Sequence, residues 1–375
     1  MKILFLSDLL AYGGASKLIY DLLQRMAAEG HCCELLILTD EHSKYIDDLK
    51  KKGIMVHVIP KEIHSHISKI KYIKRWIEKG GYDVIHANLF PTIYYCSIVK
   101  GIIGDECPPL VMTEHSTDNK RRHKFYLRLL EKSIYQKYDH VISISEKTQE
   151  NLCKWLNTEG DKRFSVIENG IDVKSFKNAE PLPREELFSG IQNGDVLILT
   201  VGSFTPQKNH EKLLEALTFL PMKYKLLLCG EGPLLEEIMN KVTLFHLDNR
   251  VIFLGFRKDV DRIMHTADIL AIPSIWEGFG LIAAEGMACE IPIVASDVPG
   301  LSEVIGEAGM KFNPKEPKQI ADAILEISKD EIAKLYTKRS SSRCLQYDIS
   351  STVSGYLTVY RDVIGAKNAK NVSKD

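Results

Sequence analysis

The sequence lacks an excess of charge of either sign, because 49 Lys and Arg residues stand against 50 Asp and Glu residues, for a net charge of -1. No general electrostatic field therefore attracts nucleic acid or an anionic membrane, and any such attraction must be local. The sequence also lacks the run of roughly 20 apolar residues that crosses a bilayer. The apolar run at residues 1–7 is too short for a signal peptide, so we expect the chain to remain in the cytoplasm.

Several motifs of metal, redox and nucleotide chemistry are missing as well. The eight cysteines form no C-x-x-C pair, and several lie in apolar runs, which indicates reduced, buried thiols. No His and Cys residues stand at zinc-binding spacing, so we expect no tightly bound catalytic metal. The turn GEGP at 230–233 has Leu235 where a dinucleotide fingerprint needs glycine, which argues against a dehydrogenase.

Short apolar, β-branched runs alternate with helix-like stretches along most of the chain. Runs of this length fit parallel strands that are buried on both faces, so the sequence predicts two doubly wound α/β sheets. The runs lie at 2–8, 34–38, 55–59, 83–89, 109–115, 140–145 and 164–170, and then at 196–204, 225–232, 251–256, 268–274 and 291–297. The polar, proline-bearing stretch 177–186 separates the two sets, which predicts domains 1–180 and 181–350. We expect 351–375 to form a C-terminal helix that packs back on the first domain, followed by a frayed tail from Gly365 onward.

Basic residues are concentrated in the first half. Residues 1–180 hold 27 basic and 24 acidic residues, and within them 61–137 holds 14 basic and 8 acidic residues, including KRRHK at 120–124. Two interpretations stay open for this region. It is either a solvated helical face or a patch that meets the phosphates of a lipid-linked acceptor or an anionic membrane.

The segment PSIWEGFGLIAAEGMA at 273–288 carries the most chemical information. Its glycines let the backbone approach a ligand, and the N–H groups of residues 279–281 open a helix, where amides lack intrahelical partners and bind anions. A phosphate fits there. Because the carboxylates of Glu277 and Glu285 would repel a phosphate, we expect both to accept hydrogen bonds from hydroxyls of a sugar or ribose.

This segment resembles that of the retaining glycosyltransferases of family four, the group 1 glycosyl transferases. The most specific part is Glu277-Gly278-Phe279-Gly280-Leu281 through Glu285, and the resemblance covers roughly residues 1–345. Further motifs follow in the family's order, namely Gly13-Gly14, His115, Asn169-Gly170-Ile171-Asp172, Gly202 with Lys208, Gly230-Glu231-Gly232-Pro233, and Pro299-Gly300 with Glu303. The resemblance implies the GT-B fold, which is two facing Rossmann-like, doubly wound α/β domains with an interdomain cleft.

The resemblance also implies roles for individual residues. Glu277 would contact the donor sugar, Glu285 would hold the nucleotide ribose, and the turn between them would supply amides to the diphosphate. Lys208 would neutralise that diphosphate, and Ser203 stands where the family commonly has an arginine. His115 would contact the donor sugar beside the reacting centre. The predicted catalytic residues are therefore His115, Lys208 and Glu277, and the predicted donor-binding residues are Gly14, Ser203, Lys208, Phe256, Gly278, Phe279, Gly280, Leu281 and Glu285.

One departure from the family pattern is Asn88, which stands where relatives often have a second histidine. We expect it to lie outside the donor site and to affect the choice of acceptor.

The function implied is a retaining transfer of a sugar from a nucleotide diphosphate sugar, with UDP favoured, to a hydroxyl of a glycan or lipid-linked acceptor in cell-surface polysaccharide or glycolipid synthesis. We expect no metal, no cofactor besides the nucleotide sugar as substrate, and no nucleic-acid partner. The basic 61–137 region is a candidate for a peripheral contact with the inner face of the membrane. Two alternatives stay open: a nucleotide-sugar epimerase of the same architecture, which would consume donor without an acceptor, and a noncatalytic nucleotide-sugar-binding protein.

Overall fold

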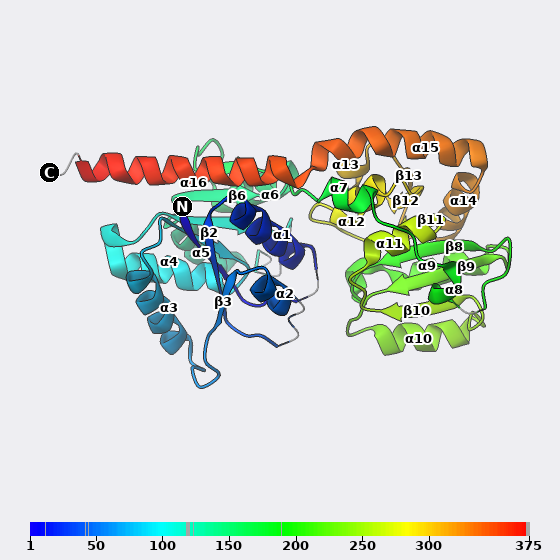
Figure 1. The fold of residues 1–375 in the computed structure, drawn as a ribbon, viewed down its shortest axis with the longest axis horizontal. Helices are drawn as coiled ribbons and strands as arrows, with labels where there is room; N and C mark the ends of the chain where they lie inside the picture. The colour runs from blue at the N-terminus through cyan, green and yellow to red at the C-terminus, as the bar shows by residue number, and fades with distance from the viewer. Residues whose placement is uncertain are drawn as a thin grey trace. The chain divides into compact units, whose positions relative to one another are not determined.

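The chain forms two compact units in its computed structural model, which describes residues 1–372 apart from 12, 42, 44, 118–120, 123 and 189 (Figure 1). Unit 1 holds Met1–Asn169 together with the C-terminal segment from Ile349, and unit 2 holds Gly170–Asp348. The chain therefore leaves unit 1 at the Asn169-Gly170 turn, before the polar stretch 177–186 from which the boundary was expected. Ile171 and Asp348, near the two crossing points, form an isolated parallel bridge within unit 2.

Unit 1 is built on a parallel sheet. Its strands are β1 Lys2–Ser7, β2 Cys32–Ile37, β3 Met55–Val58, β4 Val84–Asn88, β5 Leu110–Glu114, β6 His140–Ser143 and β7 Phe164–Val166. They pair in the order β3-β2-β1-β4-β5-β6-β7. Its helices are α1 Gly14–Ala28, α2 Ile46–Lys51, α3 His66–Gly80, α4 Thr92–Ile103, α5 Arg128–Tyr135, α6 Glu146–Leu156 and α16 Ile349–Val372, with short 3₁₀ helices η1 Gly104–Glu106 and η2 Phe125–Leu127.

Both faces of this sheet are covered, as the continuous apolar runs predict. Leu4 and Leu6 of β1 point into a core that is shared with α3 to α6, whereas Ile3 and Phe5 point into a core that is shared with α1, α2 and α16. Successive side chains of a strand alternate between faces, so one apolar strand supplies both cores. Helix α16, red in Figure 1, continues to Val372, so residues 365–372, expected to fray, are helical.

Unit 2 repeats this plan with a second parallel sheet. Its strands are β8 Val196–Val201, β9 Tyr224–Cys229, β10 Val251–Gly255, β11 Ile269–Ile272, β12 Ile293–Ser296 and β13 Met310–Phe312. They pair in the order β10-β9-β8-β11-β12-β13. Its helices are α7 Val173–Lys177, α8 Arg184–Leu187, α9 His210–Thr218, α10 Leu235–Leu244, α11 Val260–Thr266, α12 Leu281–Ala288, α13 Leu301–Ile305, α14 Pro317–Ile327 and α15 Asp330–Arg343, with 3₁₀ helices η3 Pro206–Lys208 and η4 Cys344–Tyr347.

The predicted class, α/β with two doubly wound parallel sheets, is therefore confirmed, and one short strand, β13, was not predicted. Within the described residues, no helix is both long enough and apolar enough to cross a bilayer.

Candidate functional site

The predicted donor residues of unit 2 follow the carboxyl ends of its central strands. Ser203 and η3 follow β8, and the loop 273–280 follows β11, the strand that pairs directly with β8. Loops after neighbouring parallel strands emerge at one edge of the sheet, which is where doubly wound sheets bind ligands. Segments about 70 residues apart in the sequence are thereby brought together.

Lys208 and Glu277 form a direct ion pair at this edge. Lys208 Nζ lies 2.5 Å from Glu277 Oε1, and Ser274 Oγ donates a second hydrogen bond to the same oxygen at 2.8 Å. The Glu277 side chain is 9% exposed and that of Lys208 is 19% exposed, so the pair is largely removed from water. Ser274 is fully buried, and the sequence analysis did not single it out; its only signal was its place three residues before Glu277.

The loops that carry this pair are tied to each other by backbone contacts. The Ile275 N–H donates to Gln207 O at 2.8 Å, and Gln207 Nε2 donates to Trp276 O at 2.9 Å. Asn209 adopts a left-handed conformation with φ of 54°, and its side-chain amide donates to Pro273 O at 3.0 Å. These contacts fix the ammonium and the carboxylate on one rigid framework.

Glycines make room for this framework. A Cβ at Gly202 would lie 3.1 Å from both Cδ and Cε of Lys208, so the absence of a side chain lets the lysine stem pass. Gly300, with φ of 84°, approaches the Glu277 carbonyl so closely that a Cβ would lie 2.6 Å from that oxygen. Pro299-Gly300 was noted as a family motif, and packing of its backbone against the Glu277 loop is the physical reason for glycine there.

The turn 278–281 opens α12 as expected. Gly280 is the N-cap of α12 with φ of 91°, and no side chain caps this end of the helix. Phe279 is 3% exposed, because its ring packs edge-to-face on Tyr347 with centroids 5.5 Å apart. The Phe279 side chain is therefore held inside unit 2, and the amide role expected of this turn stays a prediction.

The other donor residues of unit 2 lie on nearby elements. Glu285 is half-buried on α12, close enough to Cys289 to help raise the pKa of that thiol, although burial is the larger cause. Ser203 and Phe256, which follow β8 and β10, are also half-buried. The donor roles of these three residues stay predictions.

A buried histidine packs against the loop that follows β8. The His210 ring stacks on Phe204 with centroids 4.4 Å apart. Burial, with a smaller contribution from the Lys208 charge, lowers the pKa of His210 to about 4. The ring is therefore neutral at pH 7, and Lys208 is the cation that this loop presents.

The unit 1 members of the predicted site lie at the carboxyl edge of the other sheet. Gly14 is the exposed first residue of α1, and its neighbour Gly13, with φ of 136°, is the N-cap. His115 follows β5. Its Nε2–H donates to Asn88 Oδ1 at 3.0 Å, since an amide oxygen can only accept.

The His115 contact corrects the expectation for Asn88. Asn88 is 1% exposed, and its Nδ2 faces the carbonyls of Leu6 and His86 at 3.5 Å, which directs its Oδ1 toward His115. Asn88 is thus a direct partner of a predicted catalytic residue. Burial lowers the pKa of His115 to about 4, and its Nδ1 is buried without a hydrogen-bond partner among the described residues. At pH 7 His115 is a neutral ring that donates through Nε2.

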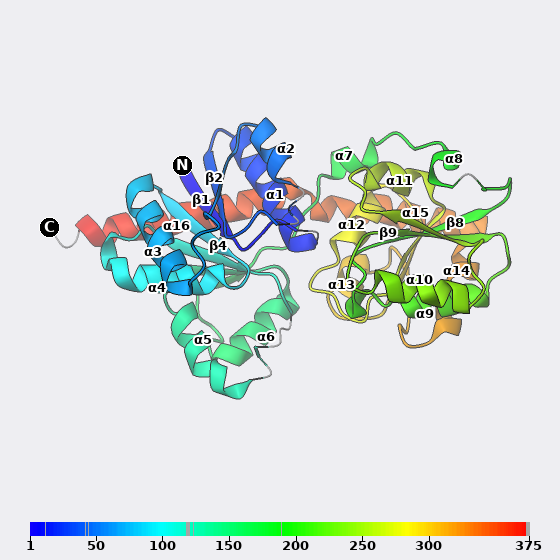
Figure 2. The ribbon, with the colours of Figure 1, turned by 90° about the horizontal axis from the view of Figure 1, so that it is seen from below.

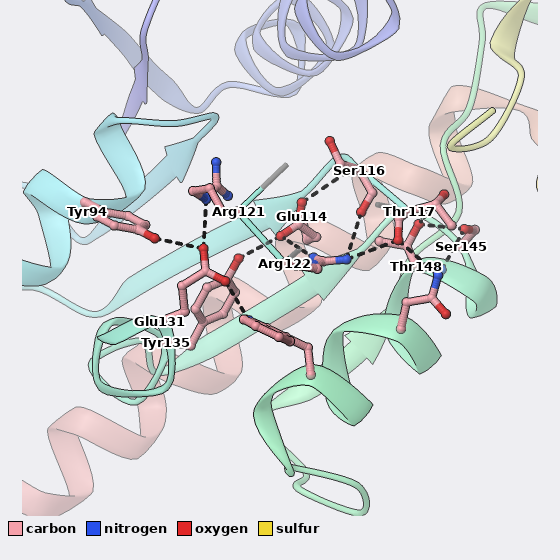
Figure 3. A network of polar contacts seen from close by, with 12 residues as sticks. Tyr94, Glu114, Ser116, Thr117, Arg121, Arg122, Glu131, Tyr135, Ser145 and Thr148 are labelled. Carbon is pink, nitrogen blue, oxygen red and sulfur yellow. Dashed lines mark hydrogen bonds and ion pairs between the residues drawn. The ribbon is translucent and has the colours of Figure 1, made fainter. Parts of the chain in front are cut away.

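Two buried carboxylates organise the chain beyond His115, as Figure 3 shows. Glu114 accepts a hydrogen bond from Tyr135 Oη at 2.7 Å and pairs with Arg122 at 3.0 Å. Glu131, which is 1% exposed, accepts from Tyr94 Oη and Arg121 Nε at 2.8 and 2.7 Å. The network anchors the predicted basic run KRRHK in part through buried pairs; Lys120 and His123 of that run lie outside the described residues.

We expected no Asp-x-Asp triplet, a common metal-binding pattern, but one occurs at Asp259-Val260-Asp261, so that expectation was wrong. Asp259 pairs with Arg257, whose Nη2 lies 2.6 Å from Oδ2. The described residues include no group of three or more His, Cys, Asp or Glu side chains that could hold a metal ion.

Comparisons with known proteins agree with this architecture. The family model "Glycosyl transferases group 1" matches residues 184–342, and "Glycosyltransferase Family 4" matches residues 12–175. An uncharacterized glycosyltransferase of Methanocaldococcus jannaschii is 31% identical over 266 residues, which is 66% of this chain and 67% of the relative. A UDP-Gal:alpha-D-GlcNAc-diphosphoundecaprenol alpha-1,3-galactosyltransferase of Escherichia coli is 24% identical over 353 residues, 89% of this chain and 88% of the relative.

Among solved structures, Anabaena HepE in complex with UDP and glucose matches this chain with a TM-score of 0.81 at 22% identity. The match covers 96% of this chain and 100% of the HepE chain. The two family models fall on the two units, and the fold match extends over both. The chain belongs to the group 1 glycosyltransferases of family four, and it is a transferase with the GT-B fold.

Proposed function

We propose that this glycosyltransferase moves a sugar, with retention of anomeric configuration, from a UDP-sugar to a hydroxyl of a lipid-linked acceptor, without a metal or a cofactor. The observation that carries the proposal is the pairing of Lys208 with Glu277 beside the glycine-bounded start of α12. One cation, one polyol-binding carboxylate and a helix N-terminus are the groups that a sugar diphosphate requires.

The ion pair gives Lys208 a defined place before the donor arrives. A diphosphate bound at the α12 turn competes with Glu277 for the ammonium, and the carboxylate is then released toward the hydroxyls of the sugar. Because the framework of Gln207 and Asn209 holds both loops in place, little reorganisation accompanies the exchange. As the bond to the leaving group breaks, negative charge grows on the diphosphate and its attraction to Lys208 increases.

Retention is proposed to occur by attack of the acceptor on the face from which the diphosphate departs, and the departing phosphate takes the acceptor proton. Glu277 is assigned hydrogen bonds to the sugar hydroxyls and no covalent role, and Ser274 Oγ still donates to its Oε1 when Lys208 turns to the diphosphate. Glu285 is assigned to the ribose, and Gly14, Ser203, Phe256 and residues 278–281 to the donor, as the family resemblance implies. His115, whose Nε2–H donates to Asn88, is assigned to the donor sugar as a neutral ring whose Nδ1 accepts a hydrogen bond.

The acceptor proposal draws on the printed name of the Escherichia coli relative, which specifies a diphosphoundecaprenol-linked acceptor. The same name and the UDP in the HepE structure support UDP as the donor nucleotide. With an acceptor of this kind, we propose that the reaction takes place at the cytoplasmic face of the membrane, in synthesis of cell-surface polysaccharide or glycolipid.

A thermal-shift panel of UDP-, GDP- and ADP-sugars tests the donor. A ligand at 100 times its dissociation constant stabilises the folded state by about 2.7 kcal/mol, which is readily measured. We expect UDP-sugars to raise the melting temperature, and no shift with any member at millimolar concentration contradicts the donor site. Product analysis by NMR then reports the anomeric configuration, and donor turnover that proceeds without an acceptor favours an epimerase.

A further inference from the structure

Asn88 ends β4 and lies on the face of the sheet that packs against α16. His86, two positions earlier on the same strand, stacks on Tyr356 of α16 with ring centroids 5.5 Å apart, and side chains two positions apart on a strand share a face. Asn88 is 1% exposed, and its register partner on β5 is Thr113. An amide that is buried this fully costs free energy unless its hydrogen bonds are satisfied, so its contacts indicate its role.

Two backbone carbonyls fix the direction in which the Asn88 amide points. Its Nδ2 lies 3.5 Å from the oxygens of Leu6 and His86. The opposite orientation would bring Oδ1 against these two oxygens, neither of which can donate, and would turn the NH2 group toward His115. The amide therefore presents Oδ1, which can only accept, to His115 Nε2 at 3.0 Å.

The orientation of the amide decides where the His115 ring carries its proton. Nε2 must hold the hydrogen that Asn88 accepts, and in a neutral ring Nδ1 then has only a lone pair. Nδ1 is buried and has no hydrogen-bond partner among the described residues. A buried acceptor without a partner is unfavourable. It is satisfied by a ligand group that donates, an O–H or an N–H, and not by a carboxylate or a carbonyl.

The surroundings of the ring keep it neutral. Burial lowers the pKa of His115 to about 4, and the uncharged Asn88 amide does not oppose this. Glu114, the preceding residue, pairs with Arg122 at 3.0 Å. The pKa of His86 on β4 is lowered to about 3, by burial first and by His115 second. A neutral ring suits glycosyl transfer, because positive charge develops on the sugar as its bond to the leaving group breaks, and a cation beside it would oppose that step.

We propose that Asn88 is a positioning residue that holds His115 as the neutral Nε2–H tautomer and so makes Nδ1 an acceptor for an O–H or N–H of the donor sugar. Asn88 acts through His115 and touches no substrate itself. A carboxylate in its place would accept the same hydrogen bond but would also favour the protonated ring, which has no lone pair. The proposal rests on the proposed function for the role of His115, whereas the control of the proton by Asn88 can be measured without a donor.

Nitrogen-15 NMR of the histidine rings tests the control of the proton in the full chain without a donor. The two nitrogens of a neutral ring have well-separated shifts that report which of them carries the proton, and the His115 signals are identified by their absence from His115→Gln. We expect the wild-type ring to carry its proton on Nε2 near pH 7. We expect Asn88→Leu to give a mixture of tautomers, and Asn88→Asp to protonate the ring at a higher pH than in the wild type.

Thr113→Val is the matched control. It removes a buried hydroxyl that lies 2.9 Å from His86 Nε2 and 3.0 Å from Tyr356 Oη, and it leaves the Asn88 amide in place. The change therefore disturbs the same layer of side chains without removing the acceptor of the His115 proton. We expect its His115 signals and its pH profile to match those of the wild type.

Steady-state kinetics over a series of pH values test the consequence for the reaction. In Asn88→Leu, loss of the fixed tautomer should lower kcat by about tenfold or more. In Asn88→Asp, the lone pair on Nδ1 is lost when the ring is protonated. Its kcat should therefore fall as the pH is lowered, over a range in which that of the wild type does not, and should recover as the pH is raised.

Four outcomes overturn the proposal. They are a wild-type ring that carries its proton on Nδ1, unchanged His115 signals in Asn88→Leu, a wild-type pH profile in Asn88→Asp, and the same effects in Thr113→Val, which would make disturbed packing the cause. Circular dichroism and the melting temperature establish that each variant is folded, and Asn88→Asp, which keeps the shape of the side chain, carries the test if Asn88→Leu does not fold. If the proton responds as expected in a protein that no nucleotide sugar stabilises, the control of His115 by Asn88 stands and the proposed function fails.

Discussion

Replacing Lys208 by alanine tests whether the ion pair with Glu277 serves both the fold and the reaction. The substitution removes the ammonium 2.5 Å from Glu277 Oε1 and leaves a carboxylate of which 9% is exposed. Breaking a buried pair by removing one partner costs about 3 to 5 kcal/mol. Ser274 Oγ stays within 2.8 Å of the carboxylate, and the lysine is partly exposed, so we expect a loss of about 2 to 3 kcal/mol in the free energy of unfolding.

The effect on the reaction is separate from the effect on the fold. Loss of one charged hydrogen bond to the departing diphosphate removes about 1 to 3 kcal/mol of transition-state stabilisation, which corresponds to a fall in turnover of about tenfold or more. Lys212→Ala is the matched control, because Lys212 pairs with Glu215 at 2.8 Å in the same unit but is more exposed. We expect its free energy of unfolding to change by less than about 0.5 kcal/mol and its turnover to be normal.

Urea denaturation and steady-state kinetics of four proteins complete the test, namely the wild type, Lys208→Ala, Glu277→Gln and the double variant. If the unpaired carboxylate causes the loss of stability, Glu277→Gln in the Lys208→Ala background restores most of it. Near-normal kinetics in Lys208→Ala would remove this lysine from the mechanism. Additive stability effects would show that the two side chains do not interact in solution as they do in the structure.

Three further predictions concern other parts of the site. Burial lowers the pKa of His86 to about 3 and that of His210 to about 4, so between about pH 6.5 and 4 the unfolded state binds protons that the folded state does not. The free energy of unfolding should therefore decrease as the pH is lowered through this window, by about 1.4 kcal/mol per pH unit for each histidine. His210→Leu should reduce this slope, measured by urea denaturation, by one proton. Glu285→Ala should raise the Michaelis constant for the donor with the fold intact, and unchanged donor affinity would reject the ribose assignment. Gly202→Ala should displace the flexible Lys208 stem and lower turnover in a folded protein, whereas Gly230→Ala, whose Cβ would lie 2.0 Å from the backbone oxygen of Gly202, should lower the melting temperature severely; equal melting temperatures for the two would contradict the packing described.

The architecture of both units could be predicted from sequence because their strands are buried on both faces. Such strands read as continuous apolar runs, as at β8 and β11, whose residues are almost all buried. β13 escaped prediction since it is a three-residue edge strand, Met310–Phe312, with exposed Lys311 at its centre. The position of the boundary between the units, at Asn169, was not predicted either, because the chain forms a short helix, α7, before the polar stretch begins.

The residues of the donor site could be named from the motif, but their contacts could not. Lys208 and Glu277 are 69 positions apart, and only the pairing of β8 with β11 brings their loops together. The contact between Asn88 and His115 likewise depends on the pairing of β4 with β5.

Helix α16 has a consequence for how the protein can be synthesised and truncated. Tyr356 and Tyr360 of this helix contact the buried His86 ring and belong to the core beneath β1, so unit 1 is completed by residues that follow unit 2 in the sequence (Figure 2). During synthesis on the ribosome, unit 2 is completely translated before α16, the last helix of the unit 1 core, has been made. A fragment that ends at Asn169 would lack α16 and would leave the core of unit 1 exposed on that face. Residues 170–348 form unit 2 as one contiguous segment, which can be produced without either part of unit 1.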